Sequence, residues 1–120
     1  MRALKSTDLF AALRVVKEIG VKDEMKQFAQ AINQGRMSEK TQRELGLELI
    51  FGLLANCGTE AAEKAFFAFL SGPMEMTVQE LREMDLDVFA DKVKEFIASV
   101  DIEHWRSFFS SLADLMKKQS

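Results

Sequence analysis

Apolar side chains recur at intervals of three and four residues along most of the chain, which is the spacing of one face of an α-helix. The first such segment begins at Ser6 or Thr7 and ends at Gly20. Its buried face is predicted to contain Leu9, Leu13 and Val16. A second helix is predicted over residues 22–33, and its apolar stripe consists of Met25, Phe28, Ala29 and Ile32.

A third, longer helix is predicted from Ser38, which caps it, to Cys57. Residues 45–57 are apolar on nearly every side of such a helix, so we expect this half to lie at the centre of the core. Gly46 and Gly52 each cost roughly 1 kcal/mol of helix propensity relative to alanine. Glycines at these positions indicate close contact with neighbouring helices, because the missing side chain lets two elements approach.

The fourth predicted helix is capped by Thr59 and continues to Leu70, where Ser71-Gly72-Pro73 is expected to break it. Thr77 and Glu80 then have the spacing of a capping box, in which each side chain accepts a hydrogen bond from the other residue's backbone N–H. A short helix is therefore predicted to begin there.

Two further amphipathic helices complete the chain. The first begins near Asp85 or Asp87, and its predicted stripe is Phe89, Val93, Phe96, Ile97 and Val100. Asp101 is expected to cap the last helix, whose stripe is Trp105, Phe108, Phe109, Leu112, Leu115 and Met116. The whole pattern predicts an all-α fold, a compact single-domain bundle of about six to seven short helices over residues 1–120.

Composition supports one globular domain. The 120 residues are 48% apolar and 29% charged, with one proline and no tyrosine, which is an ordinary globular composition. A chain of this length is expected to bury roughly two-thirds of its unfolded surface, so a single core is sufficient.

No segment is expected to direct the chain out of the cytoplasm. Residues 1–10 contain charged side chains and lack the apolar centre of a signal peptide. Residues 45–57 include Glu48 and are well short of the ~20 apolar residues that a membrane-spanning helix needs. Cys57 is the single cysteine, which excludes an intrachain disulfide and fits a reducing compartment. We therefore expect a cytoplasmic protein without membrane contact.

The residues that catalysis and metal binding require are scarce. His104 is the single histidine and Cys57 the single cysteine, so a tetrahedral zinc site lacks ligands. Asp87, Asp91 and Glu95 share one helical face, which we interpret as a solvated surface rather than as a pair of hydrolase carboxylates. Nucleophile elbows and phosphate-binding glycine loops are absent from the sequence. We expect no enzymatic activity, no cofactor and no bound metal.

Charge is unevenly distributed along the chain. Residues 1–60 carry nine Lys or Arg against eight Asp or Glu, whereas residues 61–120 carry seven against eleven. This asymmetry is compatible with head-to-tail self-association. Arg36, Lys40 and Arg43 form a basic strip at helical spacing, which is the best argument for nucleic-acid binding. Phosphate binding usually uses a larger positive surface, so nucleic acid is not the expected partner.

Large apolar side chains are abundant, with ten phenylalanines, one tryptophan and seven methionines. A small helical domain cannot easily enclose all of them, so part of this set is predicted to form a surface that binds another protein. Phe67 lies off the stripe of its helix, and three aromatic residues of the last helix lie beside charged ones, a mixture suited to an interface. The predicted partner-binding residues are Phe67, Trp105, Phe108 and Phe109. The alternative for the last three is that they close the core.

Two stretches carry a family resemblance: KSTDLF at residues 5–10 leading into VVKEIGVK at residues 15–22, and MTVQELREMDLDVFADKVKEF at residues 76–96. Together with Phe108 and Phe109, they resemble tail assembly chaperones of long-tailed, siphovirus-type bacteriophages. The likeness spans most of the chain, and its motifs are helix patterns rather than catalytic ones.

The resemblance implies a non-catalytic protein that acts during virion assembly in the cytoplasm of the infected bacterium and is absent from the mature virion. Its client is then the long helical tape measure protein, which it keeps soluble while tail tube subunits are recruited. Some members also have a frameshifted, longer form; a chain ending at Ser120 corresponds to the short one. A general helical adaptor or a phage regulatory protein remains the alternative interpretation.

Overall fold

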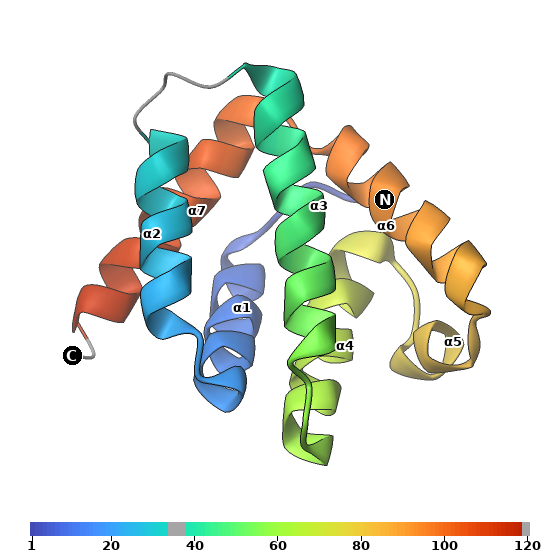
Figure 1. The fold of residues 1–120 in the computed structure, drawn as a ribbon. Helices are drawn as coiled ribbons and strands as arrows, with labels where there is room; N and C mark the ends of the chain where they lie inside the picture. Colours follow the sequence, from blue (N-terminus) through green and yellow to red (C-terminus); the bar gives the residue numbers. More distant parts are fainter. Residues whose placement is uncertain (34–37, 119–120) are drawn as a thin grey trace.

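The computed structural model describes residues 1–33 and 38–118, and helices account for most of them (Figure 1). Within these ranges there is no strand, so the predicted all-α fold of about six to seven helices is confirmed. The helices are α1 (Ser6–Ile19), α2 (Lys22–Asn33), α3 (Glu39–Ala55), α4 (Glu60–Met74), α5 (Val78–Glu83), α6 (Leu86–Ser99) and α7 (Ile102–Lys118). No helix among the described residues has both the length and the apolar character needed to cross a membrane.

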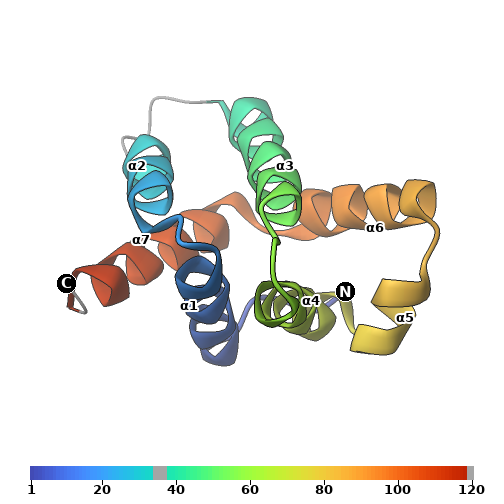
Figure 2. The same ribbon diagram turned by 60° about the horizontal axis from the view of Figure 1, so that its bottom comes forward.

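The helices form three layers, which are clearest in Figure 2. Helices α6 and α7 run end to end through the middle, α2 and α3 lie on one side, and α1, α4 and α5 lie on the other. The most extensive pairings are those of α1 with α4 and of α2 with α7, while α3 packs mainly on α6. Each pairing buries an apolar stripe of both partners.

One continuous cluster of buried side chains joins all seven helices. Its fully enclosed members come from six helices and include Val16, Ile32, Phe66, Leu70, Leu81, Val93, Phe96 and Leu112. The predicted stripe of α6 is buried throughout. In α7 all predicted positions are buried except Leu115, which is half-buried, and Leu9 of α1 is half-buried in the same way.

The predicted caps explain where most helices begin. The Ser38 hydroxyl accepts a hydrogen bond from the Thr41 backbone N–H, and Thr59 caps α4 in the same manner. The capping box of Thr77 and Glu80 is present, with both hydrogen bonds formed. Local sequence therefore determines these boundaries, because each cap satisfies backbone donors that have no partner within the helix.

The predicted break at Ser71-Gly72-Pro73 is wrong, since α4 continues to Met74. Pro73 lies in the last turn, so its missing N–H removes only one hydrogen bond near the helix end. The helix stops instead at Glu75, which has a left-handed backbone with φ of 55°. The chain's N-terminal segment also contacts this end, where the Arg2 backbone N–H donates to the Pro73 carbonyl at 2.9 Å.

A buried ion pair fixes that segment against α4. The Arg2 guanidinium donates two hydrogen bonds to the Asp8 carboxylate, at 2.8 and 3.0 Å, and these bonds raise the pKa of Arg2. Asp8 also accepts from the Lys5 backbone N–H at 2.7 Å. The pair lies against Gly72, where a Cβ would contact the Arg2 guanidinium and the Asp8 carboxylate. A larger residue at this position would displace the end of the Arg2 side chain.

The prediction that residues 45–57 form the centre of the core is wrong. Helix α3 lies in an outer layer, and its inward stripe is narrow: Gln42, Gly46, Ile50 and Leu53. The helix also ends at Ala55, before Cys57. Helix α3 packs mainly on α6 and to a lesser extent on α4, so few helices surround it. The apolar residues on its flanks are therefore left without full cover.

Candidate protein-binding surface

Three of the four predicted partner-binding residues lie in the core. Trp105, Phe108 and Phe109 of α7 are only 5%, 7% and 3% exposed. The expectation that they form an accessible surface is wrong, and the alternative that they close the core is confirmed. Phe67 is half-buried. The exposed phenylalanine is instead Phe10 on α1, at 52%.

Aromatic packing accounts for the burial of the α7 residues. The Phe109 ring lies edge-on to Phe28 of α2 and to Trp105, with centroid separations of 4.8 Å in both cases. Phe108 stacks on Phe69 of α4 at 6.3 Å. Such pairs add to the hydrophobic gain from burial. Helix α7 is therefore covered from both outer layers, and its aromatic residues connect α2 to α4.

Phe67 is covered from α6. Its ring lies edge-on to Phe66 at 5.5 Å and to Phe89 at 6.1 Å. Its position off the main stripe of α4 was correctly identified, but the first turns of α6 lie over that side of the helix. Phe67 therefore joins the core from its edge and does not form a free anchor.

Helix α3 provides the largest set of half-buried apolar side chains on one element. We call this set the α3 surface, and it consists of Leu45, Leu47, Leu49, Phe51 and Leu54. Leu47, Leu49, Phe51 and Leu54 pack against the core, and the five residues lie on both flanks of the narrow buried stripe. A partner protein could cover these side chains further, because each of them is only half-buried.

A groove runs between α2 and α3, and one flank of the α3 surface forms its wall. Its volume is about 290 Å³, and most of its lining is apolar: Val21, Met25, Phe28, Leu45, Leu49 and Leu53, with Gly52 and Asn56 at one end. We call it the α2–α3 groove. It exists because α2 packs on α7 rather than on α3. Consecutive helices thus leave a channel between them.

The two glycines of α3 have different surroundings. A Cβ at Gly46 would lie 2.5 Å from Cζ2 of Trp105, so the predicted close contact is confirmed there. A Cβ at Gly52 would meet no atom within 4 Å, so the same prediction is wrong for this residue. Gly52 is exposed and lines the α2–α3 groove. No contact within the described chain accounts for a glycine at that point.

Carboxylates without cationic partners border the α2–α3 groove. Glu24 of α2 and Glu48 of α3 both line it and are exposed. Neither forms an ion pair with another described residue, and no Lys or Arg is among the groove's lining residues. The groove is therefore apolar inside and negative at its rim.

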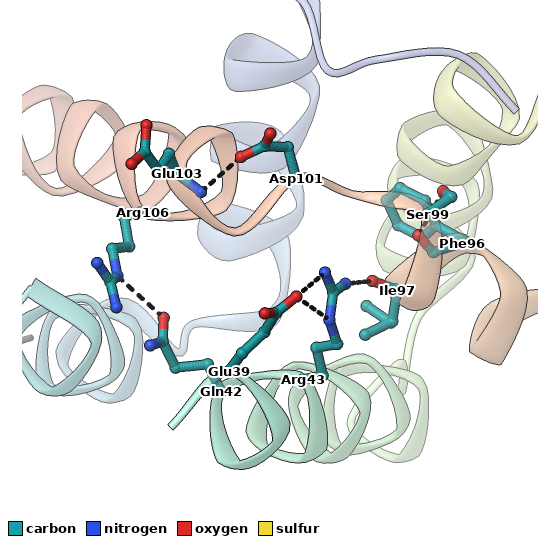
Figure 3. Close-up of polar contacts among 9 residues, drawn as sticks. All are labelled: Glu39, Gln42, Arg43, Phe96, Ile97, Ser99, Asp101, Glu103 and Arg106. Carbon is teal, nitrogen blue, oxygen red and sulfur yellow. Dashed lines mark hydrogen bonds and ion pairs between the residues drawn. The ribbon is translucent and has the colours of Figure 1, made fainter. Parts of the chain in front are cut away.

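The other side of α3 is joined to α6 by polar contacts, which Figure 3 shows. Arg43 donates to the Ile97 carbonyl near the end of α6 and is paired with Glu39 at 2.7 Å. A positive group is favourable there because the last carbonyls of a helix carry partial negative charge. Arg106 of α7 donates to Gln42, which is fully buried. This side of α3 is attached to the bundle.

These contacts bear on the basic strip. Arg36 lies outside the described residues. Lys40 is exposed, but Arg43 is half-buried and already engaged by Glu39 and Ile97. Arg43 therefore stabilises the fold, and a phosphate group would have to compete with its carboxylate partner. The strip offers less free positive charge than its sequence spacing indicated.

The remaining titratable candidates do not form a cluster. His104, Asp87, Asp91 and Glu95 are all exposed, and the described residues contain no group of His, Cys, Asp and Glu side chains arranged to hold a metal ion. Cys57 is half-buried, and burial together with the nearby Glu63 carboxylate raises the pKa of its thiol. A raised pKa reduces the thiolate fraction. Cys57 lies just after the end of α3.

Asp101 caps α7 as predicted. Its Oδ1 accepts from the Glu103 backbone N–H at 2.8 Å. This hydrogen bond lowers the pKa of the Asp101 carboxyl. The cap fixes the start of α7, and so the position of Trp105 one turn later.

The α3 surface was missed because a helix that is apolar all round was interpreted as buried. Two features of the sequence pointed to it: Gly52 interrupts an otherwise strong helix, and Glu48 stands within the apolar run. No protein-family model matches the chain, and no curated protein or solved structure is similar to it.

Proposed function

We propose that this chain is a non-catalytic assembly chaperone that binds a long helical client protein through the α3 surface. The observation that carries the proposal is the half-exposed state of Leu45, Leu47, Leu49, Phe51 and Leu54 on an outer helix. A client with its own apolar stripe gains from covering these side chains by about 25 cal/mol per Å² of apolar area removed from water.

The resemblance to phage tail assembly chaperones supplies the identity of the proposed client. A tape measure protein exposes long apolar helix stripes before the tail tube encloses it. Many copies of a small helical domain, each bound weakly, can cover such stripes, because linked contacts strengthen one another. In this proposal, tail tube subunits are the second partner, and they replace the chaperone as the tube grows in the host cytoplasm.

Self-association along the client is a further part of the proposal. The first half of the chain is slightly positive and the second half is negative. Head-to-tail contacts between unlike surfaces produce rings or open spirals rather than closed dimers. Sedimentation of the purified chain over a range of concentrations measures this, and a strictly monomeric protein at high concentration would argue against it.

Co-expression with a candidate tape measure protein tests the client. We expect the client to move into the soluble fraction and to co-purify with the wild-type chain. Leu47→Asp with Phe51→Asp should abolish both effects while the helical content is retained, because both residues are only half-buried. Ala61→Asp with Ala68→Asp, at exposed positions of α4, is the matched control, because it changes the net charge by the same amount. Equal capture by all three proteins would refute the proposal.

A further inference from the structure

The α2–α3 groove combines three properties that together specify a ligand. Its walls are apolar, its rim carries Glu24 and Glu48, and one position of the α3 wall, Gly52, has no side chain. Grooves between two helices commonly accept the apolar face of a third helix. The missing side chain at Gly52 lets a helix backbone approach closely.

The charges decide which helix fits. Glu24 and Glu48 come from opposite walls, one from α2 and one from α3, and neither is paired with a described residue. A helix lying between them meets a carboxylate on each side. Lysine or arginine on both flanks of its apolar stripe is attracted there, whereas glutamate or aspartate is repelled.

The side chains at the floor of the groove have space to move inward. Met25, Leu49 and Leu53 line the groove and also a cavity of about 30 Å³ in the core beneath it, which Trp105 lines as well. Empty space behind these side chains lets them shift inward when an anchor residue presses on them. Trp105 is the single tryptophan, and its buried Nε1 has no hydrogen-bond partner among the described residues. Its fluorescence therefore reports on this floor.

We propose that the α2–α3 groove is a binding site for a basic amphipathic helix, whose apolar stripe lies on Met25, Phe28, Leu45 and Leu49 and whose flanking lysines or arginines meet Glu24 and Glu48. This inference rests on the proposed client-binding function, since it names the client segment that binds. The inference also predicts that the groove rejects amphipathic helices with acidic flanks.

Two synthetic helical peptides of about 20 residues test the rule. They share one leucine stripe and differ only in lysine or glutamate on the flanks. Titration followed by Trp105 fluorescence and by calorimetry should show the lysine peptide binding at least about tenfold more tightly at low salt, with the difference shrinking as salt is added. Equal binding of both peptides, or binding of neither, overturns the inference.

Charge reversal in the protein identifies the site. Glu24→Lys with Glu48→Lys should exchange the preference, so that the glutamate peptide becomes the tighter ligand. Asp91→Lys with Asp114→Lys changes the net charge equally at exposed positions of α6 and α7 and should leave the preference unchanged. The same loss of preference in both double variants would show that net charge, and not the groove, selects the peptide.

Blocking the groove provides a test without charge. Gly52→Leu adds a side chain where no atom lies within 4 Å of the Cβ, so the fold should be kept while binding of the lysine peptide falls by about tenfold. Ala68→Leu, at an exposed position of α4, is the control and should bind normally. Undiminished binding by Gly52→Leu contradicts the site.

These outcomes separate the inference from the proposed function. If the lysine peptide binds as described but no tape measure protein co-purifies, the groove chemistry stands and the client identity fails. If the tape measure protein co-purifies and Gly52→Leu captures it normally, the chaperone function stands and the groove is not its site.

Discussion

Helices α3 and α4 follow one another in the chain and are both rich in large apolar residues, but they differ in what covers them. Helix α4 buries Phe66, Phe69 and Leu70 and is contacted by α1, by α5 and by the N-terminal segment. Helix α3 buries Ile50 and Leu53 and leaves five apolar residues half-exposed. The apolar content of a helix thus determines how much its burial would stabilise the protein. The number of neighbouring helices determines whether its apolar side chains are buried within the same chain.

The largest expected difference comes from removing one phenylalanine ring from each helix. Phe66→Ala in α4 should lower the free energy of unfolding by about 3–5 kcal/mol, because the side chain is completely enclosed. Phe51→Ala in α3 should cost less than half of that, since Phe51 is only half-buried. Urea denaturation of both variants measures the difference. Equal costs would mean that α3 is as well covered as α4.

The cover of α4 by the N-terminal segment can be removed separately. Arg2→Met leaves the Asp8 carboxylate, which is 3% exposed, without its ionic partner. The free energy of unfolding should fall by about 2 to 3 kcal/mol, somewhat less than for a fully buried pair because the Arg2 side chain remains 23% exposed. Thermal unfolding checks this value. A neutral effect would show that the segment does not stabilise α4.

Within α3, the two glycines should respond with opposite signs. Gly46→Ala drives a methyl group into Trp105 and should destabilise by about 1 to 2 kcal/mol while altering tryptophan fluorescence. Gly52→Ala meets no atom and should stabilise the helix by up to about 1 kcal/mol. Chemical denaturation of the two variants tests whether Gly46 lies on the inward face of α3 and Gly52 on its outward face. The same sign for both would contradict the described orientation.

The smallest expected effect is electrostatic and concerns Asp101, which caps α7. Because the pKa of Asp101 is lowered in the folded chain, its contribution to stability is complete above the ordinary aspartate value of about 3.9 and is lost as the pH falls below it. Asp101→Ala should therefore lower the melting temperature at pH 7 and have less effect near pH 3. Asp101→Asn retains a capping side chain and serves as the pH-independent control.

Much of the helix layout was predictable from the sequence because it is local. Ser38, Thr77 and Glu80 satisfy backbone groups only three residues away, and the stripes of α6 and α7 depend on spacing alone. The candidate surface was not predictable in the same way. The position of α3 depends on contacts such as the one between Arg43 and Ile97, which are 54 residues apart.

The aromatic residues show the same limit. Spacing placed Trp105, Phe108 and Phe109 on one stripe of α7, but it could not show that Phe28 and Phe69 would cover that stripe from two other helices. The predicted break at Ser71-Gly72-Pro73 was wrong for a local reason: Pro73 falls in the last turn of α4, where its missing N–H removes only one hydrogen bond. The prediction that part of the apolar set binds another protein stays a prediction, and the largest group of half-buried apolar residues lies on α3.

The most direct test of the α2–α3 groove as the client site is site-specific photocrosslinking in cells that co-express the chain with its proposed tape measure client. A benzophenone side chain placed at Asn56, an exposed residue that lines the groove, should crosslink to the client. The same group at Asp91, exposed on α6, should not. Crosslinks from Asp91 and none from Asn56 would contradict the account.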